Sequence, residues 1–297
     1  MDYKIIEVDI DDEIISRKVD NLLGQVFGIN GGALPYNKLK DNTSTKGVNK
    51  SLYLAAVENN EIIGFNAFIS HTLFLNNESI NCYQSCWTAT DNAHRGKKIF
   101  QNILEDAKKK LQTRDAGFIF GFPNEISQPI FIHKLGFKEI PSIKLNIPKE
   151  GFLKSFFFNK NINDIVHLNK NSILQNEQEL YELKKAEYGS KLIKVELNGN
   201  TIWGTIRQKN IKGIKICFFD IGGIEIKNTE DIPALFQKVS KLNRFSFFQI
   251  VTTKNNSYNQ VFKRVKPAKT NDLIIFDLNL DSSCFNFNFF AGIKDVW

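Results

Sequence analysis

The ten residues from 90 to 99 read Thr-Asp-Asn-Ala-His-Arg-Gly-Lys-Lys-Ile, and they decide how the first half of the chain is interpreted. A largely apolar run over residues 80–90 leads into them and predicts a strand. After them, apolar residues fall on one face of a predicted helix: Ile99, Phe100, Ile103, Leu104, Ala107 and Leu111. The sequence therefore predicts a strand that enters a short basic turn and continues as an amphipathic helix.

The basic turn lies where a helix can bind an anion. The first amides of a helix have no acceptor within the helix, and they give its N-terminus a partial positive charge that suits phosphate. Arg95, Lys97 and Lys98 add formal positive charge at the same end. Cations there oppose the helix dipole by roughly a few tenths of a kcal/mol each, and a bound anion reverses that sign. Three solvated side chains are the alternative, which explains their placement less well.

Residues 3–146 give a regular succession of elements around this turn. We predict strand, helix, three antiparallel strands, helix, strand, helix and strand, over residues 3–10, 14–26, 52–57, 62–74, 80–90, 99–111, 118–122, 127–135 and 137–145. Asp11 and Asp12 suit the start of the first helix, and Gly28 suits its end. This succession predicts an α/β protein with a mixed sheet.

Residues 192–278 repeat the order in outline. The corresponding segments are residues 192–197, 202–208, 215–221, 232–242, 247–251 and 274–278. Gly204 stands in the second hairpin where Gly64 stands in the first. Asp220 and Glu225 stand where the basic turn would be, and their carboxylates would repel phosphate. We predict one domain over residues 1–146 and a second over 147–297 without a phosphate site; chance matching of common patterns is the alternative.

Composition excludes several classes of protein. The 297 residues carry a formal net charge of +7, spread along the chain as single Lys residues, so no nucleic-acid or membrane partner is expected. Cys82 and Cys86 lack a nearby His, so no metal site is expected. The N-terminus does not resemble a signal peptide, and no run is apolar enough to span a bilayer. A cytoplasmic location is the default expectation.

The turn resembles the acyl-CoA pyrophosphate motif of the GNAT acetyltransferases, whose form is Gln/Arg-x-x-Gly-x-Gly/Ala. The three marked positions are Ala93, Gly96 and Lys98 here, so only the middle one matches. Residues 134–140, Lys-Leu-Gly-Phe-Lys-Glu-Ile, resemble the family's ending from helix to strand. The hairpin around Ile62-Ile63-Gly64-Phe65 resembles its second and third strands. Together with the repeated order, the resemblance implies tandem GNAT-like acyl-CoA N-acyltransferase folds.

The resemblance also implies a coenzyme site for acetyl-CoA, without a metal. Main-chain groups near Thr88 and Thr90 would bond the pantetheine arm, and Asn124 would face the coenzyme from the next strand's exit. The pyrophosphate would bind the amides of the turn and the helix start, that is, of Arg95, Gly96, Lys97, Lys98 and Ile99. An amine of a small molecule, such as an amino sugar or amino acid, would attack the thioester.

The residues that move protons are not settled by the sequence. Many GNAT enzymes carry a Tyr acid four residues before the Gly of the Leu-Gly-Phe ending, and that position is Ile132 here. His133 and Tyr83 are the candidates, although each is also explained as a packing or surface residue, and Cys86 is a candidate nucleophile only if its pKa is lowered. No Asp or Glu lies between residues 80 and 90, so a base there would be a neutral side chain or a bound water.

Two other functions fit the same sequence. One is an aminoacyl transferase of the peptidoglycan-bridge type, which takes its acyl group from charged tRNA; the other is a silent module that binds acyl-CoA.

The acceptor pocket is expected between the two halves, because pockets favour domain interfaces. Residues 1–146 alone are expected to keep some coenzyme affinity and to lose transfer to the acceptor. The oligomeric state is not indicated.

Overall fold

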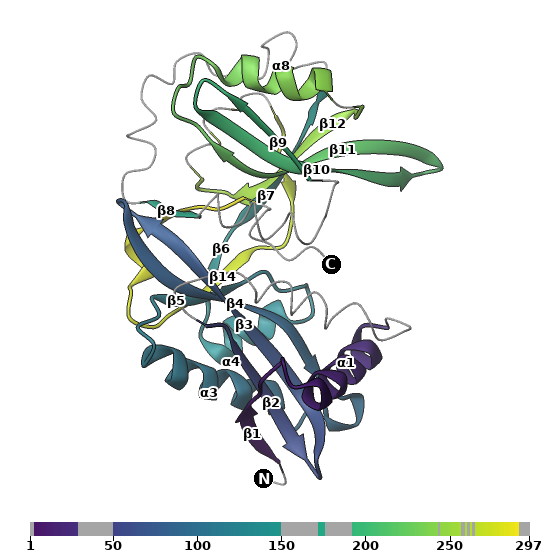
Figure 1. Ribbon diagram of the computed structural model, residues 1–297, viewed down its shortest axis with the longest axis vertical. Coiled ribbons are helices and arrows are strands. Elements are labelled where there is room, and N and C mark those ends of the chain that lie inside the picture. Colours follow the sequence, from purple (N-terminus) through teal and green to yellow (C-terminus); the bar gives the residue numbers. More distant parts are fainter. Residues whose placement is uncertain are drawn as a thin grey trace.

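The computed structural model describes residues 3–28, 50–149, 172–175, 192–242, 244–256, 259, 262 and 265–290. Within these residues the strands form a nine-stranded and a six-stranded sheet, stacked one above the other in Figure 1. Helices α1, α3 and α4 accompany the first sheet, and α8 accompanies the second. The predicted α/β class with mixed sheets is confirmed.

The first sheet has the strand order β1-β2-β3-β4-β5-β14-β6, with β8 paired to β3 and to β15. Its strands are β1 (Lys4–Glu7), β2 (Leu52–Glu58), β3 (Glu61–Leu75), β4 (Glu78–Thr90), β5 (Phe118–Gly121), β6 (Lys138–Ile140), β8 (Ser172–Gln175), β14 (Leu273–Asp277) and β15 (Asn286–Asn288). Its helices are α1 (Glu13–Phe27), α3 (Ile99–Gln112) and α4 (Gln128–Leu135), with a 3-10 turn η1 (Asn92–His94) after β4. The sheet is antiparallel except for the pairs β4–β5 and β8–β15.

The second sheet has the order β13-β7-β12-β11-β10-β9. Its strands are β7 (Ser142–Pro148), β9 (Leu192–Leu197), β10 (Asn200–Ile211), β11 (Ile214–Glu225), β12 (Phe247–Thr253) and β13 (Ala268–Lys269). Helix α8 (Ile232–Leu242) connects β11 to β12, and these two strands are parallel. A further 3-10 turn, η4 (Ser282–Cys284), follows β14.

The two sheets exchange one strand each. β7, from the first half of the sequence, lies between β12 and β13 in the second sheet. β14, from the end of the chain, lies between β5 and β6 in the first sheet. The strands β2-β3-β4-β5-β14-β6 of the first sheet therefore correspond in order to β9-β10-β11-β12-β7-β13 of the second. In each sheet the strand next to the last one in this order comes from the other half of the sequence. This symmetry agrees with the predicted duplication.

Two sequence-based assignments are wrong because of this exchange. The single strand predicted over residues 137–145 is divided at Pro141 into β6 and β7, which belong to different sheets. A proline has no N–H for the ladder, so it is suited to the point where the chain leaves one sheet. The strand predicted over residues 274–278 exists as β14, but it completes the first sheet. The domain boundary at residue 146 stays a prediction.

The position assigned to the second turn is also corrected. β11 continues to Glu225, so Asp220 lies within a strand, where its Oδ2 accepts a hydrogen bond from Arg207 Nε. The chain turns between Ile226 and Asp231 instead. The glycines at 222 and 223 favoured an earlier turn, but Gly222 lies where a Cβ would clash with the ring of Trp203, at 2.1 Å. It therefore serves close packing within the sheet.

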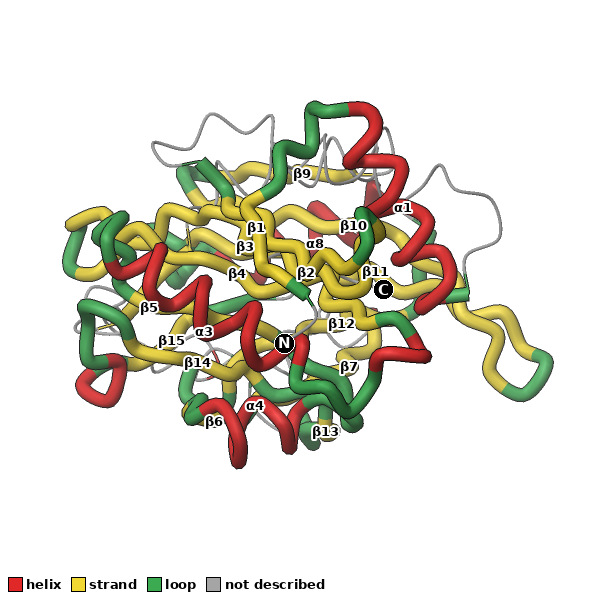
Figure 2. Tube along the Cα trace, turned by 90° about the horizontal axis from the view of Figure 1, so that it is seen from below, coloured by secondary structure: helices red, strands yellow, loops and turns green. Residues whose placement is uncertain are grey.

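Helices cover both faces of the first sheet. α1 packs on one face through Val19, Leu22 and Leu23, and α3 packs on the other through Ile103, Leu104 and Leu111. Figure 2 shows α1 and α3 on opposite sides of the strands. A further cluster, with Phe118, Trp203 and Phe287, joins the two sheets. α1 begins and ends as predicted, because the side chain of Asp12 caps the amides of Ile14 and Ile15, and Gly28 has a left-handed conformation with φ +68°.

Candidate coenzyme site

The basic turn joins β4 to α3 through two residues in left-handed conformations. After η1, Gly96 has φ +85° and Lys98, the residue that precedes the helix, has φ +60°. A glycine adopts the first conformation without strain, whereas lysine rarely adopts the second. The side chains from Arg95 to Lys98 are all exposed. This backbone turns the chain sharply and presents the end of α3 to solvent.

The N-terminus of α3 has no side-chain cap. The amide of Asn102 donates to the carbonyl oxygen of Lys98 at 3.0 Å and closes the first turn of the helix. The amides of residues 98–101 therefore precede the helical ladder and point out of its end. The amides of Arg95 and Lys97 donate to Asn92 and His94 within the turn, at 3.5 and 3.4 Å. The amides that a ligand can reach therefore begin at Lys98, three residues after the start of the predicted range 95–99.

The space in front of this turn suits an anion. A Cβ built on Gly96 would meet no heavy atom within 4 Å, so a ligand can approach the backbone there. Tyr3 holds the turn from the side, since its hydroxyl donates to the carbonyl oxygen of Lys97 at 3.4 Å and accepts from Asn102 Nδ2 at 2.6 Å. Exposed cations, open amides and a glycine without neighbours fit a pyrophosphate. The sequence had not indicated Tyr3, because one Tyr near a strand start carries no functional signal.

His94 connects the turn to its neighbours through two carboxylates. Its Nδ1 bonds Asp91 Oδ2, and its Nε2 lies 3.0 Å from Glu58 Oε2 at the end of β2. The hydrogen bond from Asp91 and then that from Glu58 raise the pKa of His94, against partial desolvation and the charge of Lys97. The bond to His94 lowers the pKa of Asp91 in return. His94 therefore ties the turn to the β2–β3 hairpin by bridging two carboxylates.

β4 and β5 separate just before the turn. They pair only at Tyr83 with Ile119 and at Gln84 with Phe120. Beyond these pairs β4 has a bulge opposite residues 65–67, with Trp87 in a left-handed conformation at φ +56°. The two parallel strands therefore stop pairing after Gln84 and Phe120; we call this divergence the opening, and β4 leads from it to the turn.

Thr88 and Thr90 lie on β4 between the opening and the turn. Thr90 pairs with Gly64, and the hydroxyl of Thr88 donates to Asn66 Oδ1 at 3.0 Å. Asn66 Nδ2 in turn donates to Ser85 Oγ at 3.0 Å, and Asn66 is fully buried. Sequence reasoning missed Asn66 and Ser85, although a polar residue inside the apolar run 62–69 is the signal that could have shown them.

Asn124 is engaged in its own turn. Its Oδ1 accepts hydrogen bonds from the amides of Ile126 and Ser127, at 3.1 and 2.9 Å. It thereby shapes the connection from β5 to α4.

The candidate acid–base residues are not brought together. Tyr83 is fully buried in the core under α3, and its hydroxyl donates to the carbonyl oxygen of Lys50 at 3.4 Å. His133 is exposed on α4, while Ile132 packs against the core. Cys86 is buried under α1. Neither candidate acid, Tyr83 or His133, lies beside the opening with a free polar atom, and the described residues contain no cluster suited to a metal ion.

The comparisons with known proteins agree with this geometry. The family model for an acetyltransferase (GNAT) domain matches residues 16–140. No curated protein matches the chain by sequence. No described helix is long and apolar enough to cross a membrane.

Solved structures share the fold over most of the chain. A GCN5-related N-acetyltransferase from Anabaena variabilis ATCC 29413 superposes with a TM-score of 0.67 and 8% identity, covering 93% of this chain and 73% of that one. Eis1 from Mycobacterium abscessus gives 0.61 and 10%, covering 93% and 73%. N-myristoyltransferase from Saccharomyces cerevisiae with bound myristoyl-CoA gives 0.52 and 9%, covering 93% and 79%. At these identities the likeness concerns the fold.

The family model includes β4, the basic turn and all of α3, the elements that build the candidate site. The fold shared with the solved acetyltransferases extends beyond them into the second sheet. Residues 16–140 are accordingly a GNAT acetyltransferase domain, and the fold of the chain as a whole is shared with solved GNAT N-acetyltransferases.

Proposed function

We propose that this chain transfers an acetyl group from acetyl-CoA to the amine of a small molecule, such as an amino sugar or amino acid. The observation that carries the proposal is the N-terminus of α3, which has no side-chain cap and lies beside three exposed cations. Solved N-myristoyltransferase, with myristoyl-CoA bound, shows that this fold can hold an acyl-CoA.

The electrostatics of the turn favour an anionic ligand. Arg95, Lys97 and Lys98 oppose the dipole of α3, at a cost of about 0.3–1 kcal/mol each when exposed. A pyrophosphate beside the amides of residues 98–101 would be attracted by both the dipole and the side chains. The arrangement is therefore unfavourable without a ligand and favourable with one, which a solvated surface patch would not explain.

The chain's own residues would position the reaction. The thioester of acetyl-CoA supplies the acyl group that the amine attacks. The turn would anchor the pyrophosphate, and the main chain at Thr88 and Thr90 would guide the pantetheine arm toward the opening between β4 and β5. Because no carboxylate lies on β4 beside that opening, the buried Asn66–Ser85–Thr88 cluster is our candidate for orienting a water that accepts the amine's proton.

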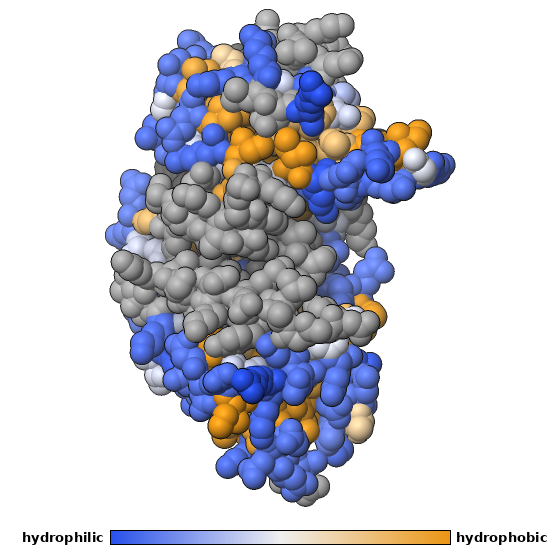
Figure 3. All heavy atoms as spheres, turned by 45° about the vertical axis from the view of Figure 1, so that its right-hand side comes forward, coloured by the Kyte–Doolittle hydropathy of each residue, from blue (hydrophilic) through white to orange (hydrophobic). Residues whose placement is uncertain are grey.

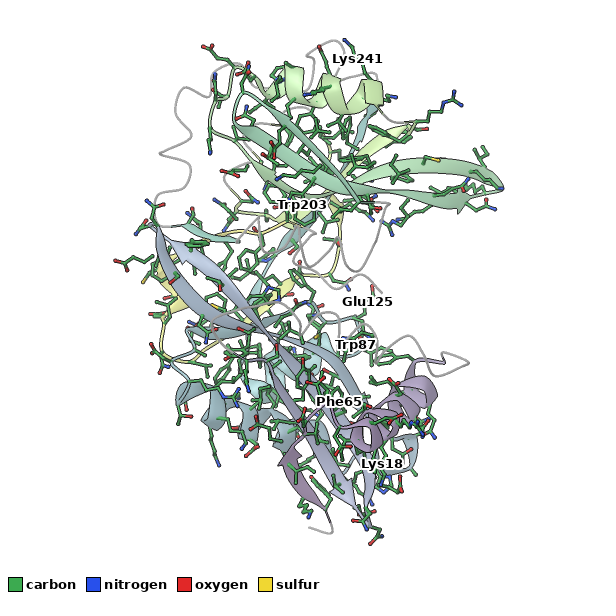
Figure 4. The ribbon with its side chains drawn as sticks, viewed as in Figure 1. Lys18, Phe65, Trp87, Glu125, Trp203 and Lys241 are labelled. Atoms are coloured by element: carbon green, nitrogen blue, oxygen red, sulfur yellow. The ribbon has the colours of Figure 1, made fainter. Side chains whose placement is uncertain are left out.

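The acceptor would bind between the two sheets. A cavity with room for about one water molecule marks the place where the ends of β5 and β12 approach each other. It is lined by Phe122, Ser142, Val251, Thr252, Thr253, Phe289 and Phe290. In Figure 4, Trp203 lies on the side of the second sheet that faces the first half, and Trp87 lies on the nearer side of the first half. The second half would thus provide one wall of the acceptor site.

The test is the replacement of Gly96 by valine, compared with the same change at Gly213. Both glycines have similar left-handed conformations, φ +85° and +83°, and neither has an atom within 4 Å of an added Cβ. The backbone strain of the two variants should therefore be alike. Gly96→Val should weaken acetyl-CoA binding at least about tenfold, since a hydrogen bond to a charged group contributes about 1.5–3 kcal/mol. Gly213→Val should leave it unchanged.

Isothermal calorimetry measures both the affinity and the stoichiometry, which should be one coenzyme per chain. Equal affinity for the folded Gly96→Val variant would refute the assignment, and a stoichiometry of two would refute a second half without a site. A chain that binds charged tRNA and not acetyl-CoA would be an aminoacyl transferase. Coenzyme binding without turnover of any amine would favour a silent module, which the buried Tyr83 and the apolar Ile132 also favour.

A further inference from the structure

The hairpin formed by β10 and β11 extends well beyond the rest of the second sheet. β9 pairs with β10 only from Asn200 to Thr205, and β12 pairs with β11 only from Phe218 to Ile221. The remaining segment, residues 206–217, which we call the arm, pairs only within the β10–β11 hairpin among the described residues. Figure 1 and Figure 2 both show the arm projecting from the body. It is therefore available to contact something outside the chain.

The tip of the arm is apolar. Ile211 and Ile214 form the last cross-strand pair before the turn at Lys212 and Gly213, and they are 43% and 66% exposed. By the alternation of a hairpin, the half-buried Ile216 lies on the same face as this pair. Figure 3 shows hydrophobic surface at the end of the projection, next to hydrophilic surface. Large aliphatic residues gathered at the outermost point of a protein indicate a binding surface.

The arm is also strongly basic. Residues 206–217 include Arg207, Lys209, Lys212 and Lys215, and no Asp or Glu. Asp220, just beyond the arm, neutralises Arg207. Lys209 extends over the ring of Phe218, with Nζ 5.6 Å from the centroid, while Lys212 and Lys215 are exposed beside the isoleucines. The tip thus combines two exposed isoleucines with two exposed lysines.

The other two-residue hairpin turns in the described residues have a different composition. The β2–β3 turn, Asn59–Asn60, lies between Glu58 and Glu61; the β3–β4 turn, Asn76–Asn77, is followed by Glu78; and the β9–β10 turn, Asn198–Gly199, lies between Leu197 and Asn200. None of the three combines an aliphatic pair with lysines. The arm's composition is accordingly specific to this hairpin, and its length is not required by pairing within the sheet.

We propose that the arm docks on an anionic phospholipid surface. Its composition suits such a surface: the isoleucine pair beside the turn would enter the boundary of the acyl chains, while the long side chains of Lys212 in the turn and Lys215 on the strand would extend back to the phosphates. Charge complementarity favours this partner, because a second copy of the chain would present the same positive arm. A nucleic acid would attract the lysines but would leave the isoleucine pair exposed.

Composition alone led to the expectation of no membrane partner, and the proposal differs from it. Along the sequence the lysines of the arm are single residues separated by other types, so they did not stand out. The hairpin places Lys212 in the turn and Lys215 two positions from it on the opposite strand, and it sets Ile211 against Ile214. The combination exists only in the folded hairpin.

The experiment is co-sedimentation of the full chain with vesicles at low ionic strength. The vesicles are either phosphatidylcholine alone or phosphatidylcholine with about 30% phosphatidylglycerol, the anionic component. The wild-type chain should pellet with the anionic vesicles and much less with the neutral ones. Ile211→Thr/Ile214→Thr keeps β-branched side chains at the tip and removes its apolar character, so the strand preference is retained. This variant should bind anionic vesicles at least about fivefold more weakly, because buried apolar area is lost.

A charge variant tests the contribution of the two lysines. Lys212→Gln/Lys215→Gln should bind anionic vesicles about ten- to thirtyfold more weakly, because each basic residue near such a surface contributes about 1 kcal/mol. Lys109→Gln/Lys241→Gln removes two exposed lysines from helices far from the arm and is the matched control. It should bind like the wild type, and all variants should keep the same circular dichroism spectrum and acetyl-CoA affinity.

Three results would overturn the proposal. The first is equal pelleting of the wild-type chain with neutral and anionic vesicles, or with neither. The second is an arm variant that binds anionic vesicles like the wild type, or a control variant that loses binding equally. The third is self-association in sedimentation velocity that the arm variants abolish while vesicle binding is unchanged, since the partner would then be a second copy.

Discussion

The turns that follow β4 and β11 occupy the same place in the two sheets, but they are built in opposite ways. The turn after β4 carries Arg95, Lys97 and Lys98, all exposed. The turn after β11 follows Glu225 and carries Glu230 and Asp231, with Lys227 as its one basic residue. The first turn therefore attracts an anion at the start of a helix, and the second repels one.

The amides of the two turns have different acceptors. In the first half no side chain caps α3, and the amides of residues 98–101 precede its ladder. In the second half Asn200 Oδ1 accepts from the amides of Lys227 and Asn228, at 2.7 and 2.9 Å. Asn228 Oδ1 accepts from the amide of Glu230 at 3.0 Å. In the second turn, side chains of the protein, Asn200 and Asn228, accept from these amides, whereas no side chain caps the amides at the start of α3.

The comparison teaches that this fold does not by itself bind a phosphate. Both sheets have corresponding strand orders, a parallel strand pair, and a helix that connects the two strands of that pair. What differs is a handful of residues that decide whether turn amides are occupied by the protein or left for a ligand. On our proposal, the absence of coenzyme binding in the second half would require only local changes, and the rest of that half would be free to shape the acceptor site.

The largest effect is expected from separating the halves. A chain of residues 1–149 lacks β14, which lies between β5 and β6 and supplies Ile274 to the core under α3. We expect this fragment not to fold and to bind no acetyl-CoA, whereas sequence analysis alone predicted that residues 1–146 keep some coenzyme affinity. Circular dichroism and limited proteolysis of the fragment measure this.

Co-expression of residues 150–297 is the control for that experiment. This second fragment carries β14 and lacks β7, so each fragment supplies the strand that the other needs. A soluble complex that binds acetyl-CoA should form. A fragment 1–149 that folds cooperatively without its partner would show that the exchanged strand is dispensable and that the two halves are independent.

The next effect concerns the second turn. Asn200→Ala removes the acceptor of two amides and the donor to the carbonyl oxygen of Asn228, in a fully buried position. We expect the free energy of unfolding to fall by about 2–4 kcal/mol, since buried donors left unsatisfied cost about 1–3 kcal/mol each. Denaturant titration measures this, with the exposed Asn210→Ala on the same strand as the control.

Coenzyme affinity of the folded Asn200→Ala variant should not change. The two amides that it frees face acidic neighbours, so they should not form a second phosphate site. An increase of the calorimetric stoichiometry above one would contradict this and would mean that charge matters less than open amides.

The first turn should depend on pH through His94. Its pKa is raised from 6.5 by Asp91 and then by Glu58, so the contribution of charged His94 to stability is complete below about pH 6.5. It is lost as the pH rises through the folded-state pKa. Acetyl-CoA affinity should fall over the same range, because two carboxylates beside the turn lose their cation. Calorimetry from pH 6 to about 9 measures the affinity.

His94→Gln provides the comparison for this pH dependence. The amide side chain can hydrogen-bond but carries no proton that titrates, so the variant should have a lower affinity near pH 6 and a flat profile above it. Identical profiles for the wild type and the variant would assign the pH dependence to another group.

Sequence reasoning located the first turn because its signals are local. A run of basic residues around Gly96 and an apolar helical face from Ile99 onward are both read within twenty residues. The exchange of β7 and β14 could not be found in this way, because a strand pattern indicates a buried strand without naming its partner. Residues 137–145 look like one strand until the partners are known, and only Pro141 marks the crossing.

The acid–base residues stay predictions, and strand geometry explains why the sequence could not assign them. Tyr83 lies on the strand that leads to the opening, so its position in the sequence favoured it, but alternation along the strand directs its ring into the core under α3. Asn66 was overlooked because it lies among apolar residues, although its bonds to Ser85 and Thr88 form the buried polar cluster beside the bulge. Which face a strand residue occupies is uncertain near a bulge, since one extra residue reverses the alternation.

The smallest effect tests whether Lys98 is kept for a ligand at a cost in stability. Lys98 precedes α3 with φ +60°, a conformation that is unfavourable for a residue with a Cβ, and the GNAT motif has Gly or Ala at this position. Lys98→Gly should therefore raise the free energy of unfolding of the ligand-free chain by about 0.5–1 kcal/mol, or Tm by about 2–4 °C. The same variant should bind acetyl-CoA a few times more weakly, because one cation beside the pyrophosphate is lost. Lys97→Gly is the matched control: it removes a neighbouring charge at a residue without a positive φ, so it should weaken binding without raising Tm. Thermal denaturation of both variants with and without acetyl-CoA separates the two contributions. A Lys98→Gly variant that is no more stable than Lys97→Gly would mean that the left-handed lysine is not strained, and the first turn would then differ from the second in charge and open amides alone.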